Sequence, residues 1–269
     1  MRKAINEATT METKLKHDLI LYAEAGFEGV ELWWDKIKDY LKENSVDDLK
    51  NLIKSTGLEI ASICPFLVSP FRNQLNCRDE FKKALKVADQ IGCELIVICP
   101  DFQPIEYTRE KALAMHADEL KIYCEEAATH GIKLAMEPIG LHTLLSGPKD
   151  AEALIKLAGN PDNLGYLMDT FHYAKSGITP EEVSGIDIEK LWIVHVNDSV
   201  KGMMNELEDK DRVYPTKGVL PLKAYMDALR KIGYKGFLSV ETFNQEYWKE
   251  DAKIVSVKAY EAVTDMLAL

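Results

Sequence analysis

The chain has 269 residues and a formal net charge of −11 at pH 7, with 46% hydrophobic and 29% charged residues. This composition is ordinary for a globular protein, and the negative charge disfavours nucleic-acid partners, because an acidic surface repels polyanions. No apolar run is long enough to span a membrane, and the opening lacks the apolar core of a signal peptide, so we expect a cytoplasmic protein without a membrane partner.

Short apolar runs rich in β-forming residues recur along the chain. The predicted strands are residues 4–8, 29–33, 59–64, 95–99, 133–137, 164–169, 191–197 and 237–241. Amphipathic stretches such as 79–91 and 109–130 lie between them, and glycines at 57, 92, 131 and 233 end helical stretches as C-caps do. This regular alternation predicts an α/β fold, a single (β/α)8 TIM barrel domain over residues 1–269. A doubly wound sheet is the alternative.

Four residues of metal-ligand type close four of these strands in succession: Glu137, Asp169, His195 and Glu241. A charged group at the end of a buried strand is costly unless it is paired or bound to a metal. In a parallel barrel the C-terminal strand ends all lie on one side, where the active sites of such barrels are found. Three carboxylates and one imidazole suit one divalent metal, which we expect to be Mn, Co, Mg or Zn.

The longest break in the alternation of strands and helices, residues 198–221, follows the seventh strand and contains Asp211-Arg212-Val213-Tyr214-Pro215. Long charged loops often act as lids or substrate-binding segments, and an exposed connector is the alternative. Arg212 is either a ligand contact or one half of a surface ion pair with the acidic residues around it.

Other residues leave their roles open. Trp33 and Trp34 end the second strand, where one of them is expected to form a wall of a sugar pocket or to pack in the core. Three phenylalanines that follow the third and fourth strands are candidates for an apolar pocket wall: Phe66, Phe71 and Phe102. No role is assigned to His17, His116 or His130. The cysteines have no CxxC pair and are expected to be buried, reduced thiols: Cys64, Cys77, Cys93, Cys99 and Cys124.

A resemblance joins the four strand-end residues to a known family. Glu137, Asp169-Thr170-Phe171-His172, His195-Val196-Asn197-Asp198 and Glu241 resemble the motifs of the xylose isomerase-like TIM barrel superfamily of sugar isomerases and epimerases, and the resemblance covers essentially the whole chain. It implies that Glu137, Asp169, His195 and Glu241 bind one divalent metal. It also implies that Glu137 and Glu241 face each other across the substrate as the catalytic acid and base.

The resemblance also implies a substrate pocket. His172 and Arg212 would hold substrate oxygens, Glu31 would line the pocket for a polyol, and Asn6 and Trp33 are further substrate-binding candidates. Within the family, the opening Asn6-Glu7-Ala8-Thr9-Thr10 and the segment 211–215 are most similar to members that interconvert inososes, the keto-inositols of inositol catabolism. The loop departs from the expected Pro-Gly-x-Gly, because it reads Pro215-Thr216-Lys217-Gly218.

The function implied is a metal-dependent isomerase or epimerase of a sugar or keto-inositol. The ion would polarise a carbonyl, and a carboxylate would move the neighbouring proton through an enediolate. Return of the proton at the other carbon gives isomerisation, and return on the opposite face gives epimerisation. The main alternative is a keto-inositol dehydratase of the same fold; another is a sugar-binding barrel without catalysis.

An apurinic endonuclease is a weaker alternative. Its three-metal site needs histidines after the third and fourth strands and an Asp-x-His in the loop after the seventh, where this chain has Pro65, Pro100 and Asp211-Arg212-Val213. We therefore expect a small polyol or ketose as the partner. No cluster of Arg or Lys at the strand ends predicts a phosphate site. Without a long C-terminal arm, a monomer or simple homodimer is expected.

Overall fold

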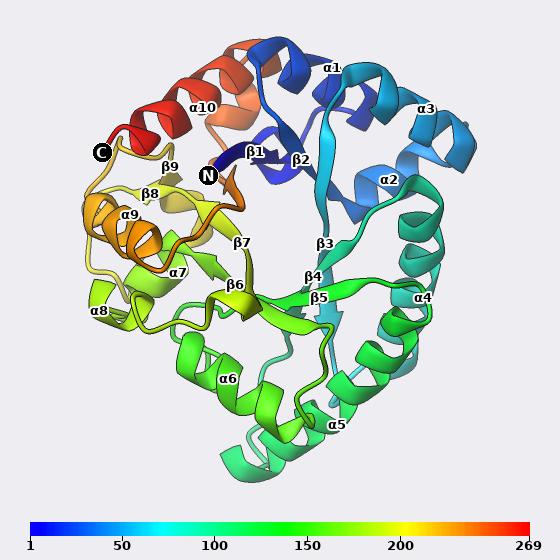
Figure 1. The fold of residues 1–269 in the computed structure, drawn as a ribbon, viewed down its shortest axis with the longest axis vertical. Coiled ribbons are helices and arrows are strands. Elements are labelled where there is room, and N and C mark those ends of the chain that lie inside the picture. The colour runs from blue at the N-terminus through cyan, green and yellow to red at the C-terminus, as the bar shows by residue number, and fades with distance from the viewer.

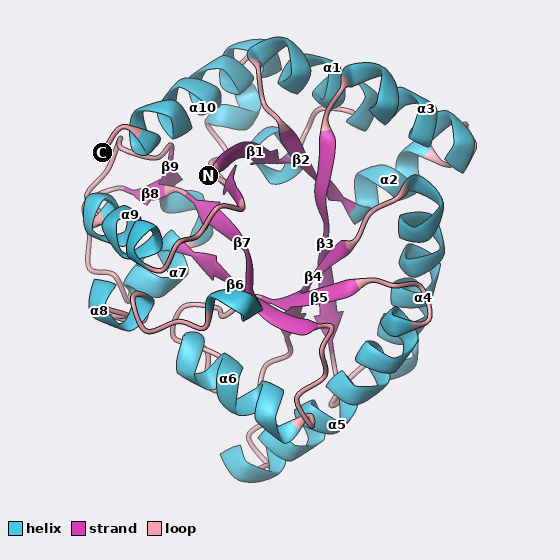
Figure 2. Ribbon diagram, viewed as in Figure 1, coloured by secondary structure: helices cyan, strands magenta, loops and turns pink.

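The computed structural model of the protein describes residues 1–269 as a closed barrel of eight parallel strands inside a ring of helices (Figure 1, Figure 2). Around the barrel the strands follow the order β1-β10-β7-β6-β5-β4-β3-β2, so that neighbours in sequence are neighbours in space. This confirms the predicted (β/α)8 fold. The barrel strands are β1 (Arg2–Asn6), β2 (Gly29–Trp33), β3 (Glu59–Val68), β4 (Leu95–Pro100), β5 (Lys133–Met136), β6 (Leu164–Asp169), β7 (Leu191–Val196) and β10 (Phe237–Val240).

Helices connect the strands and cover the outside of the barrel, where their apolar faces bury a core of 60 residues. The C-terminal helix α10 packs beside α1, which closes the ring (Figure 1). None of the helices is both long and apolar enough to cross a bilayer. The α-helices are α1 (Leu15–Ala25), α2 (Trp34–Tyr40), α3 (Val46–Thr56), α4 (Gln74–Ile91), α5 (Arg109–Ala128), α6 (Pro148–Leu157), α7 (Thr170–Lys175), α8 (Pro180–Val183), α9 (Leu222–Lys231) and α10 (Ala252–Leu267).

The first strand ends earlier than the sequence predicted. Residues Glu7–Thr10 form a 3-10 turn, η1, instead of continuing β1. The side chain of Asn6 accepts a hydrogen bond from the amide of Ala8 at 2.9 Å, which caps this turn. An Asn at such a position competes for backbone donors and ends the strand. The turn places Glu7 in the interior beside β2.

The third strand is longer than predicted. It continues past Pro65 to Val68, with a shift of its register against β4 between Ile63 and Phe66. Proline has no amide hydrogen to give to a neighbouring strand, and a register irregularity accommodates this loss. The rest of β3 carries the chain further over the barrel mouth.

The long interval 198–221 contains a small antiparallel pair, β8 (Asp198–Ser199) with β9 (Arg212–Val213), and the 3-10 turn η3 (Asp209–Asp211). The carboxylate of Asp198 accepts hydrogen bonds from the amides of Gly218 and Leu220 at 2.9 and 2.8 Å. The interval is therefore an ordered excursion anchored to the end of β7, and it brings Arg212 back toward the barrel.

Aromatic side chains close the N-terminal end of the barrel. Trp192 and Phe237 pack against a small interior cluster of mostly aliphatic side chains, which is separate from the outer core. A Cβ at Gly29 would lie 2.5 Å from the Phe237 ring, and one at Gly165 would lie 2.9 Å from Trp192, so both rings depend on glycine for their space.

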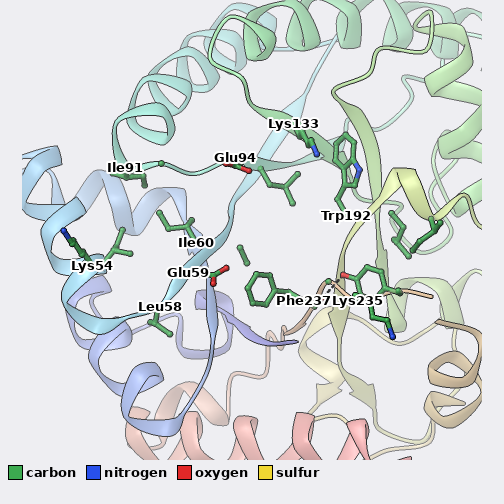
Figure 3. Close-up of a pocket in the computed structure, with 18 of the residues that line it drawn as sticks. Lys54, Leu58, Glu59, Ile60, Ile91, Glu94, Lys133, Trp192, Lys235 and Phe237 are labelled. Carbon is green, nitrogen blue, oxygen red and sulfur yellow. Dashed lines mark hydrogen bonds between the residues drawn. The ribbon is translucent and has the colours of Figure 1, made fainter. Parts of the chain in front are cut away.

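A cavity of about 880 Å³ lies at this N-terminal end, and Figure 3 shows Trp192, Phe237, Lys133 and Glu59 around it. The carboxyl ends of the strands, with the predicted ligand residues, lie at the other end of the barrel. Enzymes with this fold carry their active sites at the C-terminal end of the barrel. The cavity is therefore not the candidate active site.

All five cysteines are free, as expected. Cys64, Cys93 and Cys124 are buried, but Cys77 and Cys99 are only partly buried, which corrects the expectation for these two. Cys99 lies near the C-terminal end of β4. Its thiol lies 3.6 Å from Oε2 of Glu137, one of the predicted ligand residues.

Candidate metal centre and active site

The structure brings the four predicted ligand residues together at the C-terminal end of the barrel. Glu137 directly follows β5, Asp169 ends β6, His195 lies in β7 and Glu241 directly follows β10. One nitrogen or oxygen atom from each of the four lies within 4.8 Å of the others, and all four side chains are buried. Side chains from four strands of one barrel converge here because the parallel strands end on the same side.

Hydrogen bonds to neighbouring groups fix the backbone positions of these residues. The amide of Glu137 donates to the carbonyl of Ile98 at 2.9 Å, and that of Glu241 donates to Val196 at 3.2 Å, so both glutamates are held by the neighbouring strand. Asp169 is the N-cap of α7, and its Oδ1 accepts the amide of His172 at 2.7 Å. The other oxygen, Oδ2, remains for the site.

The imidazole of His195 connects the cluster to a carboxylate beneath it. Its Nε2 lies 2.9 Å from Oε1 of Glu31, while its Nδ1 lies 3.3 Å from Oε1 of Glu137, 3.2 Å from Oε2 of Glu241 and 4.0 Å from Oδ2 of Asp169. Nδ1 has no hydrogen-bond partner. In the neutral ring whose Nε2–H donates to Glu31, Nδ1 would direct a lone pair toward the three carboxylates. Three carboxylates and one imidazole nitrogen are a donor set that fits a divalent cation.

The charges of this cluster shift the pKa values of its members. Burial raises the pKa of Glu137 to about 7, and repulsion from Glu241 and Asp169 adds to the increase. Burial also opposes ionisation of Glu241, yet His195 and Arg212 hold its pKa below the usual value. Burial disfavours protonation of His195, but the surrounding carboxylates raise its pKa well above the usual value. Each carboxylate therefore depends on nearby positive charge.

Arg212 lies inside the site and is 1% exposed. Its Nη1 donates to Oε2 of Glu241 at 2.7 Å and to Oδ2 of Asp169 at 3.1 Å. Its Nη2 donates to Oδ1 of Asp209 at 2.6 Å and lies 2.9 Å from Nε2 of His172. The alternative of a surface ion pair is therefore wrong for Arg212, although one of its partners, Asp209, does come from the acidic turn η3.

Two aromatic rings flank this guanidinium. Its central carbon lies 5.0 Å from the ring centre of Phe171 and 5.3 Å from that of Phe243. The amide side chain of Asn244 donates to the backbone carbonyl of Arg212 at 2.9 Å. Aromatic rings this close to a planar cation restrict its motion and add a cation–π attraction. The rings and the hydrogen bonds together hold Arg212 in its orientation.

His172 lies beside Arg212, in the first turn of α7. Burial and the positive charge of Arg212 lower the pKa of His172 to about 4, so the ring is neutral. Its Nε2 is in position to accept the hydrogen bond of Arg212 and lies 4.0 Å from Oε1 of Glu137, whereas its buried Nδ1 has no partner. The side chain therefore belongs to the edge of the cluster.

The structure places the other predicted substrate contacts differently. Asn6 donates from Nδ2 to Oε1 of Glu241 at 3.0 Å, and Glu31 is fully buried below His195. Trp33 is partly buried and meets Phe243 edge to face, so it lies near the barrel mouth, while Trp34 packs in the outer core. Glu31 therefore does not have the position of a pocket-lining residue.

The phenylalanines proposed as a pocket wall separate. Phe66 is buried in the outer core and packs against Trp34 and Phe81, so it does not contribute to a wall. Phe102 is 65% exposed and packs against His142, and Phe71 contacts Tyr107 in the neighbouring loop.

Sequence reasoning missed two residues that contact the site. Asn197 donates to Oδ2 of Asp169 at 2.8 Å, and the thiol of Cys99 lies 3.6 Å from Oε2 of Glu137. The signal for Asn197 was its place two residues after His195, on the same face of the strand. Cys99 carried no comparable signal in the sequence.

The comparison with known families agrees with this geometry. The family model of the xylose isomerase-like TIM barrel matches residues 19–258. The chain belongs to this family. The resemblance stated from the strand-end motifs is therefore confirmed, and the residues that carried it are those that the barrel brings together.

Relatives in the xylose isomerase-like family are similar over most of the chain. Inosose isomerase of Bacillus velezensis is 29% identical over 259 residues, which cover 94% of this chain and 92% of the relative. A solved structure of the IolI protein with a bound zinc atom is 28% identical and has a TM-score of 0.93. The match covers 100% of this chain and 98% of the IolI chain. A 3-dehydroshikimate dehydratase of Pseudomonas aeruginosa is 28% identical over 243 residues, covering 87% of this chain but 37% of that protein.

Proposed function

We propose that this protein is a divalent-metal-dependent isomerase or epimerase of a keto-inositol or a related ketose. The observation that carries the proposal is the buried group of Glu137, Asp169, His195 and Glu241, in which an imidazole nitrogen without a partner faces three carboxylates. Support comes from the inosose isomerase relative, which is similar over nearly its whole length, and from the zinc bound in the IolI structure.

Those four residues would hold the ion. When bound, a divalent cation would act as a Lewis acid on the substrate carbonyl and balance the negative charge that develops on the oxygens of an enediolate. A set of three carboxylates and one neutral imidazole carries enough negative charge for such an ion and leaves coordination positions for substrate oxygens. Mn, Co, Mg and Zn all suit this set.

Glu137 and Glu241 are proposed as the proton-transfer pair. They follow β5 and β10, which β6 and β7 separate in the barrel wall, so they approach a substrate from two sides. One carboxylate takes the proton from the carbon next to the carbonyl, and a carboxylate returns a proton to the adjoining carbon or to the opposite face. The first return exchanges the carbonyl and hydroxyl positions, and the second inverts a centre.

Arg212 and His172 are proposed to bind substrate oxygens beside this pair. Arg212 supplies a fixed positive charge 2.7 Å from Glu241, and the neutral ring of His172 supplies a polar group beside Glu137. Both groups are buried, and electrostatic interactions are stronger in a site that excludes water. Trp33 at the mouth would pack against the apolar face of a ring.

A dehydratase is the second candidate, because the 3-dehydroshikimate dehydratase relative shares 87% of this chain's length. Its named substrate carries a carboxylate, which needs a cation to bind. The positive charge of the guanidinium beside the glutamates, Arg212, is already balanced by the carboxylates of Asp169, Asp209 and Glu241. A neutral polyol therefore suits this acidic site better than an anionic substrate does.

Proton NMR in deuterated water tests the proposal. The purified protein is incubated with scyllo-inosose and zinc or magnesium, and a parallel sample is incubated with a chelator in place of the metal. Metal-dependent entry of deuterium next to the carbonyl, together with a new keto-inositol, is expected. Loss of water from the substrate would favour the dehydratase instead. No exchange with inososes or ketohexoses at any metal would overturn the isomerase.

A further inference from the structure

We propose that Glu31 is a positioning residue for His195: it fixes the ring so that Nδ1 points into the carboxylate cluster. The inference rests on the proposed metal centre, and it replaces a substrate-contact role for Glu31. Its basis is a buried hydrogen-bond chain that links β2 to β7 directly beneath the four candidate ligands.

Both carboxylate oxygens of Glu31 contact other groups of the protein. Oε1 lies 2.9 Å from Nε2 of His195, and Oε2 accepts the hydroxyl of Ser62 at 2.6 Å and lies 3.2 Å from the same nitrogen. Glu31 is 0% exposed and His195 is also 0% exposed. A carboxylate with both oxygens engaged and no exposed surface does not present an oxygen to a polyol in the pocket above.

The carboxylate decides which nitrogen of the ring carries the proton. An ionised carboxylate only accepts hydrogen bonds, so Nε2 carries a proton, and a ring that gives up one proton to bind a metal does so at Nδ1. Nδ1 is the nitrogen that faces Glu137 and Glu241, 3.3 and 3.2 Å away. In metal sites, a carboxylate on the second nitrogen of a ligand histidine fixes the ring and makes it a stronger donor.

Asn6 extends the same support to a second candidate ligand. Its Nδ2 donates to Oε1 of Glu241 at 3.0 Å and lies 3.4 Å from Oε1 of Glu31, while its Oδ1 is occupied by the amide of Ala8. Asn6 is 0% exposed. One buried amide of β1 thus contacts both the positioning carboxylate of Glu31 and the candidate ligand Glu241.

The test measures zinc affinity and the imidazole proton in wild type, Glu31→Ala and Glu31→Gln. Zinc affinity is measured by competition with a chromophoric chelator, and the Nε2 proton of His195 is followed by proton–nitrogen NMR of the metal-free protein. Glu119→Gln is the matched control, because Glu119 is a buried glutamate that binds Arg78 and Gln74 on the outside of the barrel. Thermal unfolding confirms that each variant is folded.

Glu31→Ala is expected to lose 10- to 100-fold in zinc affinity and to lose the downfield Nε2 proton signal. Glu31→Gln retains an accepting oxygen, so it should keep the signal at a higher field and lose less affinity. Glu119→Gln should change neither. Should Glu31→Ala fail to fold, the shift of the proton signal in Glu31→Gln decides, and an unchanged signal overturns the inference.

Two further outcomes separate the positioning role from its alternatives. A raised KM with zinc affinity within twofold of wild type would return Glu31 to substrate binding and overturn the proposal. Wild-type protein that binds no divalent cation would defeat the proposed function, while the NMR signal would still report whether Glu31 holds the Nε2 proton. Failure of the metal centre and failure of the positioning role are therefore distinguishable.

Discussion

Nη1 of Arg212 lies 2.7 Å from Oε2 of Glu241, the same oxygen that lies 3.2 Å from Nδ1 of His195. Glu241 therefore receives a guanidinium, an imidazole and the amide of Asn6 around one carboxylate. A group that is held this closely is suited to act at one defined position of a substrate, because its geometry is fixed before the substrate binds.

Glu241→Gln is expected to reduce turnover by at least 100-fold, because an amide cannot accept the substrate proton. The change is isosteric, so thermal unfolding should stay close to that of wild type. Zinc affinity is measured in parallel to separate loss of the base from loss of a ligand. Retention of more than about a tenth of the rate, which corresponds to less than roughly 1.4 kcal/mol of barrier, would rule out this residue as the base.

Asp209→Ala is expected to lower kcat/KM by roughly tenfold through Arg212, because the guanidinium would lose the carboxylate that accepts from both Nη2 and Nε. The effect should disappear in an Arg212→Ala background, since the two side chains act as one unit. Glu208→Gln, an exposed change in the neighbouring turn, serves as the control. Independent, additive effects of Asp209→Ala and Arg212→Ala would contradict the coupling.

Cys99→Ala is expected to weaken zinc binding by roughly fivefold, because the thiol is the hydrogen-bond donor to Oε2 of Glu137 and one such bond contributes about 1 kcal/mol. Cys99→Ser keeps a donor and should restore most of the affinity. Cys77, another partly buried free cysteine, supplies the control Cys77→Ala. Equal affinities for the alanine and serine variants at position 99 would show that the thiol does not support Glu137.

The barrel could be predicted from the sequence because its signals are local and repeated: apolar runs, amphipathic stretches and glycine caps at regular spacing. The four candidate ligands followed from the same pattern, since parallel strands end on one side. The support beneath them could not be predicted. Glu31 and Asn6 sit on strands whose rotation about the barrel decides whether a side chain points up to the pocket or inward to His195, and the sequence does not specify that rotation.

The burial of Arg212 within residues 198–221 could not be predicted from the sequence, for a different reason. The acidic turn around Arg212 is consistent with a solvated loop, and nothing in its composition places a guanidinium at 1% exposure. Burial arises from contacts made elsewhere in the chain, with Asp169, Phe171 and Phe243. A residue whose partners lie 30 or 40 positions away is fixed by the barrel topology, so its environment appears only in the folded structure.

The stability of the protein should fall as pH rises from about 4 to about 8 because of a buried acidic pair, and within this pair Glu7 accounts for the part of the fall between about 6 and about 8. Burial raises the pKa of Glu7 to about 8 and that of Asp18 to about 6, with Lys36 as their cationic partner. Raised pKa values mean that the folded state binds protons more tightly than the unfolded state. The stabilisation from this pair is therefore fully present below the unfolded pKa values near 4, and it is lost as pH rises through the folded pKa values.

Glu7→Gln should remove much of this pH dependence. Oε2 of Glu7 accepts the amide of Trp33 at 2.7 Å, a bond that the glutamine oxygen can keep, and Oε1 has no partner. Urea unfolding from pH 5 to 9 compares wild type, Glu7→Gln and the exposed control Glu12→Gln. A slope in Glu7→Gln equal to that of wild type over pH 6 to 8 would refute the assignment.

Removal of the metal should destabilise the folded protein. An ion that binds only the folded state adds about 2.7 kcal/mol at a concentration 100 times its Kd. For a chain of this size, that corresponds to an increase in Tm of roughly 5–10 °C, which a chelator should reverse. Asp169→Asn should lose most of the increase, because one carboxylate of the group becomes a neutral amide, whereas Glu119→Gln should keep it. A zinc-dependent increase that survives in Asp169→Asn would place the ion elsewhere in the protein. Loss of the increase in both Asp169→Asn and Glu137→Gln would locate it at the group that the strand ends bring together.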